Sequence, residues 1–83
     1  DFYIPERMMG GIKRYIEEHI RPGAFLEAII SNNLKDACGK ADDENLYNLP
    51  AYVAYFYNEA SPNCWGTKER MEERLDVGIK DGD

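Results

Sequence analysis

Apolar side chains recur at steps of three and four residues along most of this chain, a spacing that places them on one face of an α-helix. The first series follows Pro5, whose missing N–H suits the first turn of a helix. It consists of Met8, Met9, Ile12, Tyr15, Ile16 and His19. The pattern predicts a helix from Pro5 to about His19, after a short extended lead-in over residues 1–4.

His19 closes this apolar stripe at the predicted helix end. A partly buried imidazole at that place can bond the last carbonyl groups of a helix. No Ser or Cys accompanies His19 in a recognisable catalytic motif. We therefore expect His19 to have a structural role.

A second helix is predicted to begin near Pro22–Ala24 and to end at Gly39, which we expect to be the left-handed residue after the helix. Its apolar face consists of Leu26, Ile29, Ile30, Leu34 and Ala37, with Phe25 at one margin. Asn33 falls inside this stripe, and an unpaired buried amide costs about 1–3 kcal/mol. Because Ser31–Asn33 is a poor helix-forming run, we expect Asn33 to hydrogen-bond a loop backbone.

A third helix follows, capped by Asp42 or Asp43 and carrying Glu44 in its first turn. Its apolar series runs through Leu46, Leu49, Val53, Phe56, Tyr57 and Ala60 and keeps its phase across Pro50. A proline inside a helix removes a hydrogen bond and clashes with the preceding turn. The alternatives are one helix kinked at Pro50, or a short turn followed by another helix that starts at Pro50. Continuity of phase favours the kinked helix.

This third helix is apolar or aromatic on nearly all sides. Its second face carries Tyr47, Ala51, Ala54, Tyr55 and Asn58, and Tyr52 lies off to the other side. Such a helix is either central in the core or has a second partner. Tyrosine is over-represented at protein interfaces, so this face is the candidate contact surface.

A loop around the only tryptophan, Trp65, separates the third helix from a fourth. We expect Trp65 to close one end of the core and Thr67 to cap a helix from Lys68 to about Val77, with Met71 and Leu75 facing inward. The tail, residues 78–83, is expected to be frayed. The prediction is an all-α single domain over residues 1–83, a small bundle of about four helices.

Net charge narrows the range of partners. The 83 residues carry 16 acidic and 10 basic side chains, a net charge of −6. Nucleic-acid backbones and anionic membranes are bound mainly by Lys and Arg, so both are unfavourable partners. The balance favours a basic protein surface, or it serves solubility alone.

Candidate chemistry is sparse. Cys38 and Cys64 are too few and too far apart for a disulfide framework or a zinc site, so we expect free thiols in a reducing cytoplasm. There is no Gly-rich phosphate loop, no paired metal-ligand spacing and no apolar run approaching a membrane span. We expect no enzyme activity, catalytic residue, cofactor or metal.

The segments PGAFLEAIISNNLKDACGKADDEN and YVAYFYNEASPNCWGTKER resemble a group of small, mostly uncharacterised phage and prophage proteins. Their pattern is PGGFL-x-AVL-x-NDL-x-EA-x-GRAD-x-x-N, then YLYN-x-x-P and GS-x-E. About two-thirds of the chain is covered, and the chain departs from the pattern at Ala24, Asn33 and Lys40. The resemblance implies a helical fold and a phage origin, and it implies no activity or functional residue.

Small acidic phage proteins often act by binding a host protein. We therefore predict a protein-binding module, with an inhibitor of a host antiviral defence complex such as a CRISPR effector as one form of it. The predicted contact residues are Asp43, Glu44, Tyr47 and Tyr55. The alternative is a nucleic-acid-binding regulator that uses the second and third helices as a helix-turn-helix, with Lys35 and Lys40 toward phosphates. A homodimer through the third helix also remains open.

Overall fold

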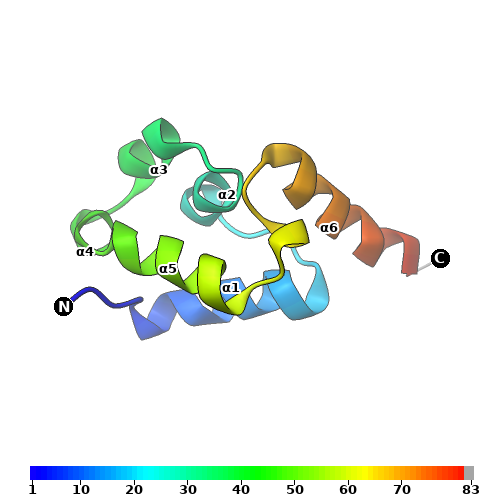
Figure 1. Ribbon diagram of the computed structural model, residues 1–83, viewed down its shortest axis with the longest axis horizontal. Coiled ribbons are helices and arrows are strands. Elements are labelled where there is room, and N and C mark those ends of the chain that lie inside the picture. Colours follow the sequence, from blue (N-terminus) through cyan, green and yellow to red (C-terminus); the bar gives the residue numbers. More distant parts are fainter. Residues whose placement is uncertain (82–83) are drawn as a thin grey trace.

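The first helix begins and ends close to where its apolar pattern predicts. The computed structural model describes residues 1–81, with side chains as far as Asp76 (Figure 1). Helix α1 spans Glu6–Glu18 and starts directly after Pro5. It ends at His19, which has a left-handed backbone (φ 59°). That conformation turns the N–H groups of His19 and Ile20 back to the carbonyls of Tyr15 and Arg14, both at 3.2 Å.

The single helix predicted from Pro22 to Gly39 is wrong, because the run Ser31–Asn33 divides it. Helix α2 spans Ala24–Ile30 and α3 spans Leu34–Lys40. Ser31 Oγ donates to the Glu27 carbonyl (2.7 Å), and Asn32 has a left-handed backbone (φ 62°). Asn33 Oδ1 then accepts from the Asp36 N–H (3.1 Å) and caps α3. The side chains of Ser31 and Asn33 thus bond the backbone in place of a continuing helix.

Two details of that prediction have different outcomes. Asn33 does bond a backbone N–H, as expected, but its side chain is exposed and does not lie in a buried stripe. Gly39 is not the left-handed residue after a helix: it lies inside α3, and the helix ends when Ala41 becomes extended (φ −76°, ψ 141°). Among the described glycines, Gly66 is the one with positive φ, at 103°.

The predicted third helix is also two helices, so the proline alternative is confirmed and the kinked helix is wrong. Helix α4 spans Asp43–Tyr47, and Asp42 caps it by accepting from the Asn45 N–H (2.8 Å). Helix α5 spans Leu49–Glu59 and has Pro50 in its first turn, where no N–H is required. Asn48 stands between the helices, and its Nδ2 donates to the Glu44 carbonyl (3.0 Å).

Because the helix is interrupted at Asn48, α5 turns a different face to the core than the predicted apolar stripe. Tyr52 and Phe56 are completely buried, so the expectation that Tyr52 lies to one side is wrong. Val53 and Tyr57, predicted to face the core, are 54% and 76% exposed. The prediction assumed one continuous phase from Leu46 onward, and the non-helical residue at Asn48 resets that phase.

The start of the C-terminal helix follows its sequence signals, but its end does not: residues 78–81 are helical where a frayed tail was expected. A 3-10 turn, η1 (Pro62–Cys64), leads to Trp65, which is half-buried against Phe56 with ring centroids 5.9 Å apart. Helix α6 spans Lys68–Asp81, and Thr67 Oγ1 accepts from the Arg70 N–H (3.1 Å). Met71 and Leu75 are buried, as predicted. The expected frayed tail includes Gly82 and Asp83, which lie outside the described residues.

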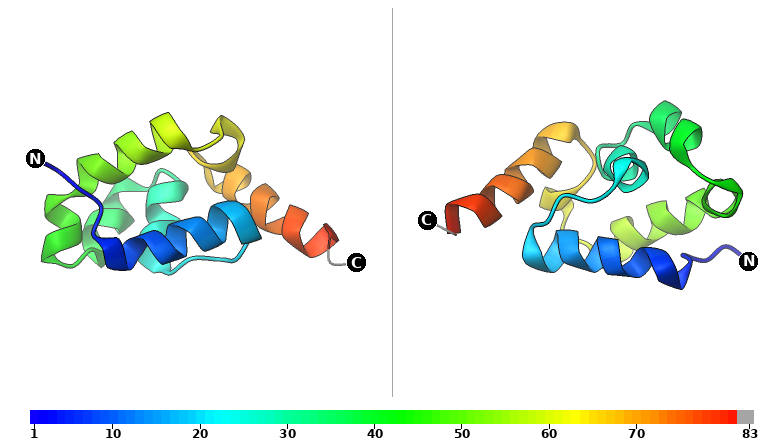
Figure 2. Two further views of the ribbon diagram at one scale, coloured as in Figure 1. Left: turned by 90° about the horizontal axis from the view of Figure 1, so that it is seen from below. Right: turned by 180° about the vertical axis from the view of Figure 1, so that it is seen from behind.

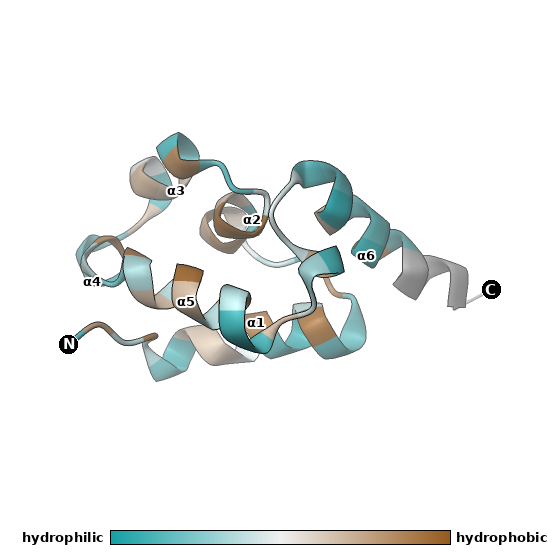
Figure 3. Ribbon diagram, in the orientation of Figure 1, coloured by the Kyte–Doolittle hydropathy of each residue, from teal (hydrophilic) through white to brown (hydrophobic). Residues whose placement is uncertain are grey.

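Residues 1–81 therefore form an all-α fold without strands, with six α-helices where about four were predicted. Helix α2 lies at the centre, packed against α3, α5 and α6, and all its apolar side chains except that of Ala24 are buried (Figure 1). The left view of Figure 2 shows α5 along one outer edge, and both views show α6 extending away from the N-terminus. Coloured by hydropathy, α2 is largely brown and the described part of α6 mostly teal (Figure 3).

Candidate protein-binding surface

The N-terminal segment does not hang free but is bound to α4. The Tyr3 N–H donates to Asn48 Oδ1 (2.9 Å), and the Tyr3 hydroxyl donates to Glu44 Oε2 (2.8 Å). The Phe2 ring packs on the Tyr47 ring at a centroid distance of 5.5 Å. Figure 1 shows the N-terminus beside α4 at one end of the molecule. Residues 40 positions or more apart in the chain thus form one surface.

An arginine of α1 holds the carboxylates of this surface in place. Arg7 Nη2 lies 2.8 Å from Asp42 Oδ2 and 3.1 Å from Glu44 Oε1. The hydrogen bond from Tyr3, followed by that from Arg7, lowers the pKa of Glu44. The Asn45 N–H, followed by Arg7, lowers the pKa of Asp42. Both carboxyl groups therefore stay ionised to a lower pH than free ones.

A buried layer of polar side chains supports these residues from below. Asn48 is fully buried, and its amide bonds both the Tyr3 N–H and the Glu44 carbonyl. Buried Asn45 accepts from the Tyr52 hydroxyl at 2.6 Å. Burial is the main cause that raises the pKa of Tyr52 to about 12. Each of these interior polar groups has a partner, so the surface above them rests on a fixed base.

The exposed side of this region combines aromatic rings with negative charge. Tyr47 is 63% exposed, Phe2 54% and Tyr3 52%. We call the six exposed residues Phe2, Tyr3, Asp42, Asp43, Glu44 and Tyr47 the acidic–aromatic surface. Exposed apolar groups gathered in one patch with a polar rim are typical of interaction sites. The single positive charge of Arg7 is shared between Asp42 and Glu44, so the three carboxylates keep an excess of negative charge.

The structure brings together three of the four predicted contact residues. Asp43, Glu44 and Tyr47 lie on one five-residue helix. Tyr55 lies elsewhere: it is half-buried on α5, and its ring packs edge-on against Phe56. Burial, followed by the carboxylates of Glu59 and Glu17, raises the pKa of Tyr55. The sequence prediction missed Phe2 and Tyr3. An apolar run directly before Pro5 was the signal, since such a run needs a surface to pack on.

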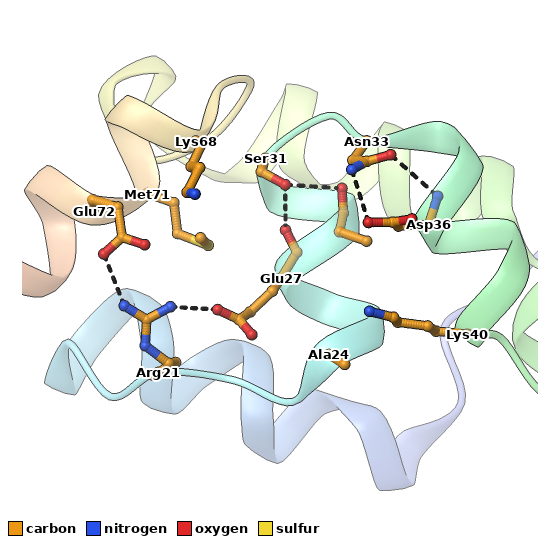
Figure 4. Close-up of a pocket in the computed structure, with 11 residues that line it drawn as sticks. Arg21, Ala24, Glu27, Ser31, Asn33, Asp36, Lys40, Lys68, Met71 and Glu72 are labelled. Carbon is orange, nitrogen blue, oxygen red and sulfur yellow. Dashed lines mark hydrogen bonds and ion pairs between the residues drawn. The ribbon is translucent and has the colours of Figure 1, made fainter.

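A pocket of about 320 Å³ lies between α2, α3 and α6 (Figure 4). It is lined by Arg21, Ala24, Glu27, Ala28, Ser31, Asn33, Asp36, Lys40, Lys68, Met71 and Glu72. Its three acidic and three basic side chains balance, and Arg21 pairs with Glu27 and with Glu72 (2.7 Å for Glu72). The Ser31 hydroxyl donates to a backbone carbonyl and has no base beside it. These contacts fasten α2 to α6, and they assemble no nucleophile–base pair.

His19, Cys38 and Cys64 are the other side chains considered as candidates for chemistry. His19 is half-buried, and its Nδ1 lies 3.0 Å from the Arg74 carbonyl of α6, not from a carbonyl of its own helix. Both cysteines are free; Cys38 is exposed and Cys64 is buried. Within the part of the chain that the structure describes, no three His, Cys, Asp or Glu side chains are grouped so that they could hold a metal ion.

No protein-family model, curated protein or solved structure matches the chain. Among the helices of the described residues, none has both the length and the apolar content needed to span a bilayer. The acidic–aromatic surface is accordingly the feature on which a function can be argued.

Proposed function

We propose that the protein acts by binding another protein through the acidic–aromatic surface, and that the partner presents a basic patch. The observation that most supports this proposal is that three exposed aromatic rings are held beside three carboxylates by contacts from three separate segments. Rigid aromatic side chains lose little conformational entropy on binding and dominate interface energies. Carboxylates at the rim favour a basic partner and speed the encounter.

The negative charge of this surface is exposed, so a basic partner can contact it. Asp43 projects from the first turn of α4 and is exposed, whereas Asp42 and Glu44 are oriented by Arg7. Because the pKa values of Asp42 and Glu44 are lowered, their charge is present at every physiological pH. Binding by this surface should therefore weaken with salt much more than with pH.

The resemblance to phage and prophage proteins directs the proposal to a host partner in the bacterial cytoplasm. Antiviral defence complexes such as CRISPR effectors hold nucleic acid in basic channels. An acidic, aromatic protein surface that occupied such a channel would inhibit the complex without any chemistry of its own. We accordingly propose an inhibitor that has no catalytic activity and needs no cofactor.

The alternative, a helix-turn-helix regulator, gains no support from the elements found. Helix α3, the last part of the predicted second helix, has seven residues and carries Lys35 and Lys40 with Asp36 between them. Helices α4 and α5, in the place of the predicted third helix, contain no Lys or Arg. Phosphate contacts need more positive charge than this. Gly39, predicted to form the corner, lies inside α3, and the chain turns into α4 at Ala41 and Asp42.

The test is capture of host proteins on immobilised wild-type protein and on the double variant Asp43→Lys/Tyr47→Ala. The matched control is Asp76→Lys/Ile20→Ala, which makes the same charge change and removes one exposed large apolar side chain elsewhere. The proposal predicts a stoichiometric partner that the control retains, that the double variant loses, and that salt elutes. A partner held equally by all three proteins would place the binding site elsewhere.

A further inference from the structure

One side of α5 is unpartnered and carries no charge. Its exposed residues are Pro50, Val53, Ala54, Tyr57 and Asn58, at steps of three and one. This is the spacing of a seam that packs on another helix. The opposite side of α5, with Tyr52 and Phe56, is buried in the core. The helix therefore has one covered and one uncovered apolar side.

An apolar groove adjoins this side. It has a volume of about 80 Å³ and lies between α2, α3, α5 and Trp65. Its walls include Leu34, Ala37, Leu49 and Val53, and Leu34 is 70% exposed. Together, the five residues named above on this side of α5 and Leu34 are called the α5 face below. Exposed apolar groups next to an apolar groove are typical of a docking surface.

The absence of charge on the α5 face contrasts with the rest of the sequence. Between Leu46 and Thr67 the one charged residue is Glu59, although charged residues make up 31% of the chain. A basic partner would gain no electrostatic attraction here. The occupant of this face must itself present an uncharged apolar surface, which distinguishes the face from the acidic–aromatic surface.

We propose that the α5 face is where two copies of this chain pack together around a two-fold axis. Two molecules of net charge −6 repel each other wherever their carboxylates meet, and at this face they can approach without opposing charges. The sizes of the side chains on the face also suit such packing. Ala54 is small enough to let two helices approach, while Tyr57 projects and the groove beside Val53 can accept a side chain of the other copy.

The dimensions of the face set the expected strength of the dimer. Helix α5 has eleven residues and is therefore about 16 Å long. One helix pair with a few flanking side chains buries less than the roughly 800 Å² per partner of a standard interface. We expect a reversible dimer with a dissociation constant of the order of 10–100 µM.

Sedimentation velocity from about 5 to 500 µM protein tests this dimer, since that range brackets the expected constant. The wild type is expected to shift from monomer to dimer across the series. Val53→Glu and Tyr57→Lys, both at exposed positions, should stay monomeric because each places two like charges in a desolvated interface. Circular dichroism of each variant checks that the helices are retained.

Ile20→Glu is the matched control, since it changes an exposed aliphatic residue to Glu outside the face, and it should dimerise like the wild type. The Asp43→Lys/Tyr47→Ala variant should also dimerise. A wild type that is monomeric throughout, a dimer that survives both Val53→Glu and Tyr57→Lys, or a dimer lost in either control protein would each overturn the proposal. None of these results bears on partner binding by the acidic–aromatic surface.

Discussion

Asn48 is the residue on which the local arrangement of the acidic–aromatic surface depends most. It ends α4, precedes α5 and bonds the N-terminal segment, all with one buried side chain. An apolar residue could fill the same space, but it would leave the Tyr3 N–H and the Glu44 carbonyl without these partners. The position therefore links a stability effect to a binding effect.

We predict that Asn48→Ala lowers the free energy of unfolding by about 1–3 kcal/mol, because it removes two hydrogen bonds and leaves a cavity. Urea unfolding followed by circular dichroism measures the change. Hydrogen exchange at the Tyr3 amide should accelerate in the same variant. The control is Asn58→Ala, whose exposed side chain bonds only the Ala54 carbonyl of its own helix. Equal effects of the two substitutions would show that Asn48 does not hold the N-terminal segment.

Tyr52 gives the fold a dependence on alkaline pH. Burial raises the pKa of Tyr52 to about 12 from an ordinary value of 10, and it raises the pKa of Tyr15 as well. A raised pKa in the folded state means that stability is complete below pH 10 and is lost as pH rises through 12. The urea midpoint should therefore fall between pH 10 and 11.

In Tyr52→Phe that fall should be shallower, while the midpoint at pH 7 is also lower because Asn45 loses its partner. The control, Tyr57→Phe, changes an exposed tyrosine and should keep the slope of the wild type. An unfolding midpoint that does not change with pH up to 11 would contradict the burial of the Tyr52 hydroxyl.

At the scale of elements, the turn between α2 and α3 depends on its short polar residues. Asn32 has a left-handed backbone, which glycine adopts freely and alanine does not. We predict that Asn32→Ala lowers the free energy of unfolding by about 1 kcal/mol, whereas Asn32→Gly is neutral or slightly stabilising. Thermal unfolding of both variants measures the difference. If the Asn32→Ala variant were as stable as the Asn32→Gly variant, the turn would not be left-handed at this position.

Pro50 distinguishes two helices from one kinked helix. A proline within a helix costs about 3 kcal/mol, so Pro50→Ala in a kinked helix would stabilise the protein by about that amount. In the first turn of α5 the N–H that proline lacks is not needed. Pro50→Ala should therefore change the free energy of unfolding by less than about 1 kcal/mol. The free energies of unfolding of the wild type and of Pro50→Ala, measured by chemical denaturation, distinguish the two cases.

The sequence predicts where helices start better than it predicts how far each helix continues. Pro5, Asp42 and Thr67 each mark a start correctly, because the capping chemistry is local. Continuity across Ser31–Asn33 and Asn48 was misjudged, since an apolar phase that persists over a gap does not show that the backbone stays helical. Asn48, at the second break, also accepts a hydrogen bond from the Tyr3 N–H, 45 positions away, which no local pattern contains.

At the scale of the whole molecule, the candidate site was only partly predictable. Asp43, Glu44 and Tyr47 share one local segment, so periodicity and composition could select them together. Phe2 and Tyr3 join them only because α1 brings the N-terminus back to α4, with Arg7 bridging to Asp42 and Glu44. Tyr55 was assigned to the same face because the third helix was treated as continuous.

The molecule as a whole presents two surfaces of different character. The acidic–aromatic surface at the N-terminal end suits a basic partner, and the uncharged α5 face suits a second copy. Because their residues do not overlap, variants can separate the two. The side chains chosen for substitution, Asp43, Tyr47, Val53 and Tyr57, are exposed, which makes these variants suitable for binding experiments.

The most direct test of the account is the dissociation constant of the captured host partner, measured by calorimetry at low and high salt. For Asp43→Lys/Tyr47→Ala we predict binding at least about 30-fold weaker than for the wild type, because interface tyrosines commonly contribute about 2 kcal/mol or more. The Asp76→Lys/Ile20→Ala control should bind as the wild type does, with the same salt dependence. An unchanged constant in the double variant, with its fold intact, would contradict the central claim.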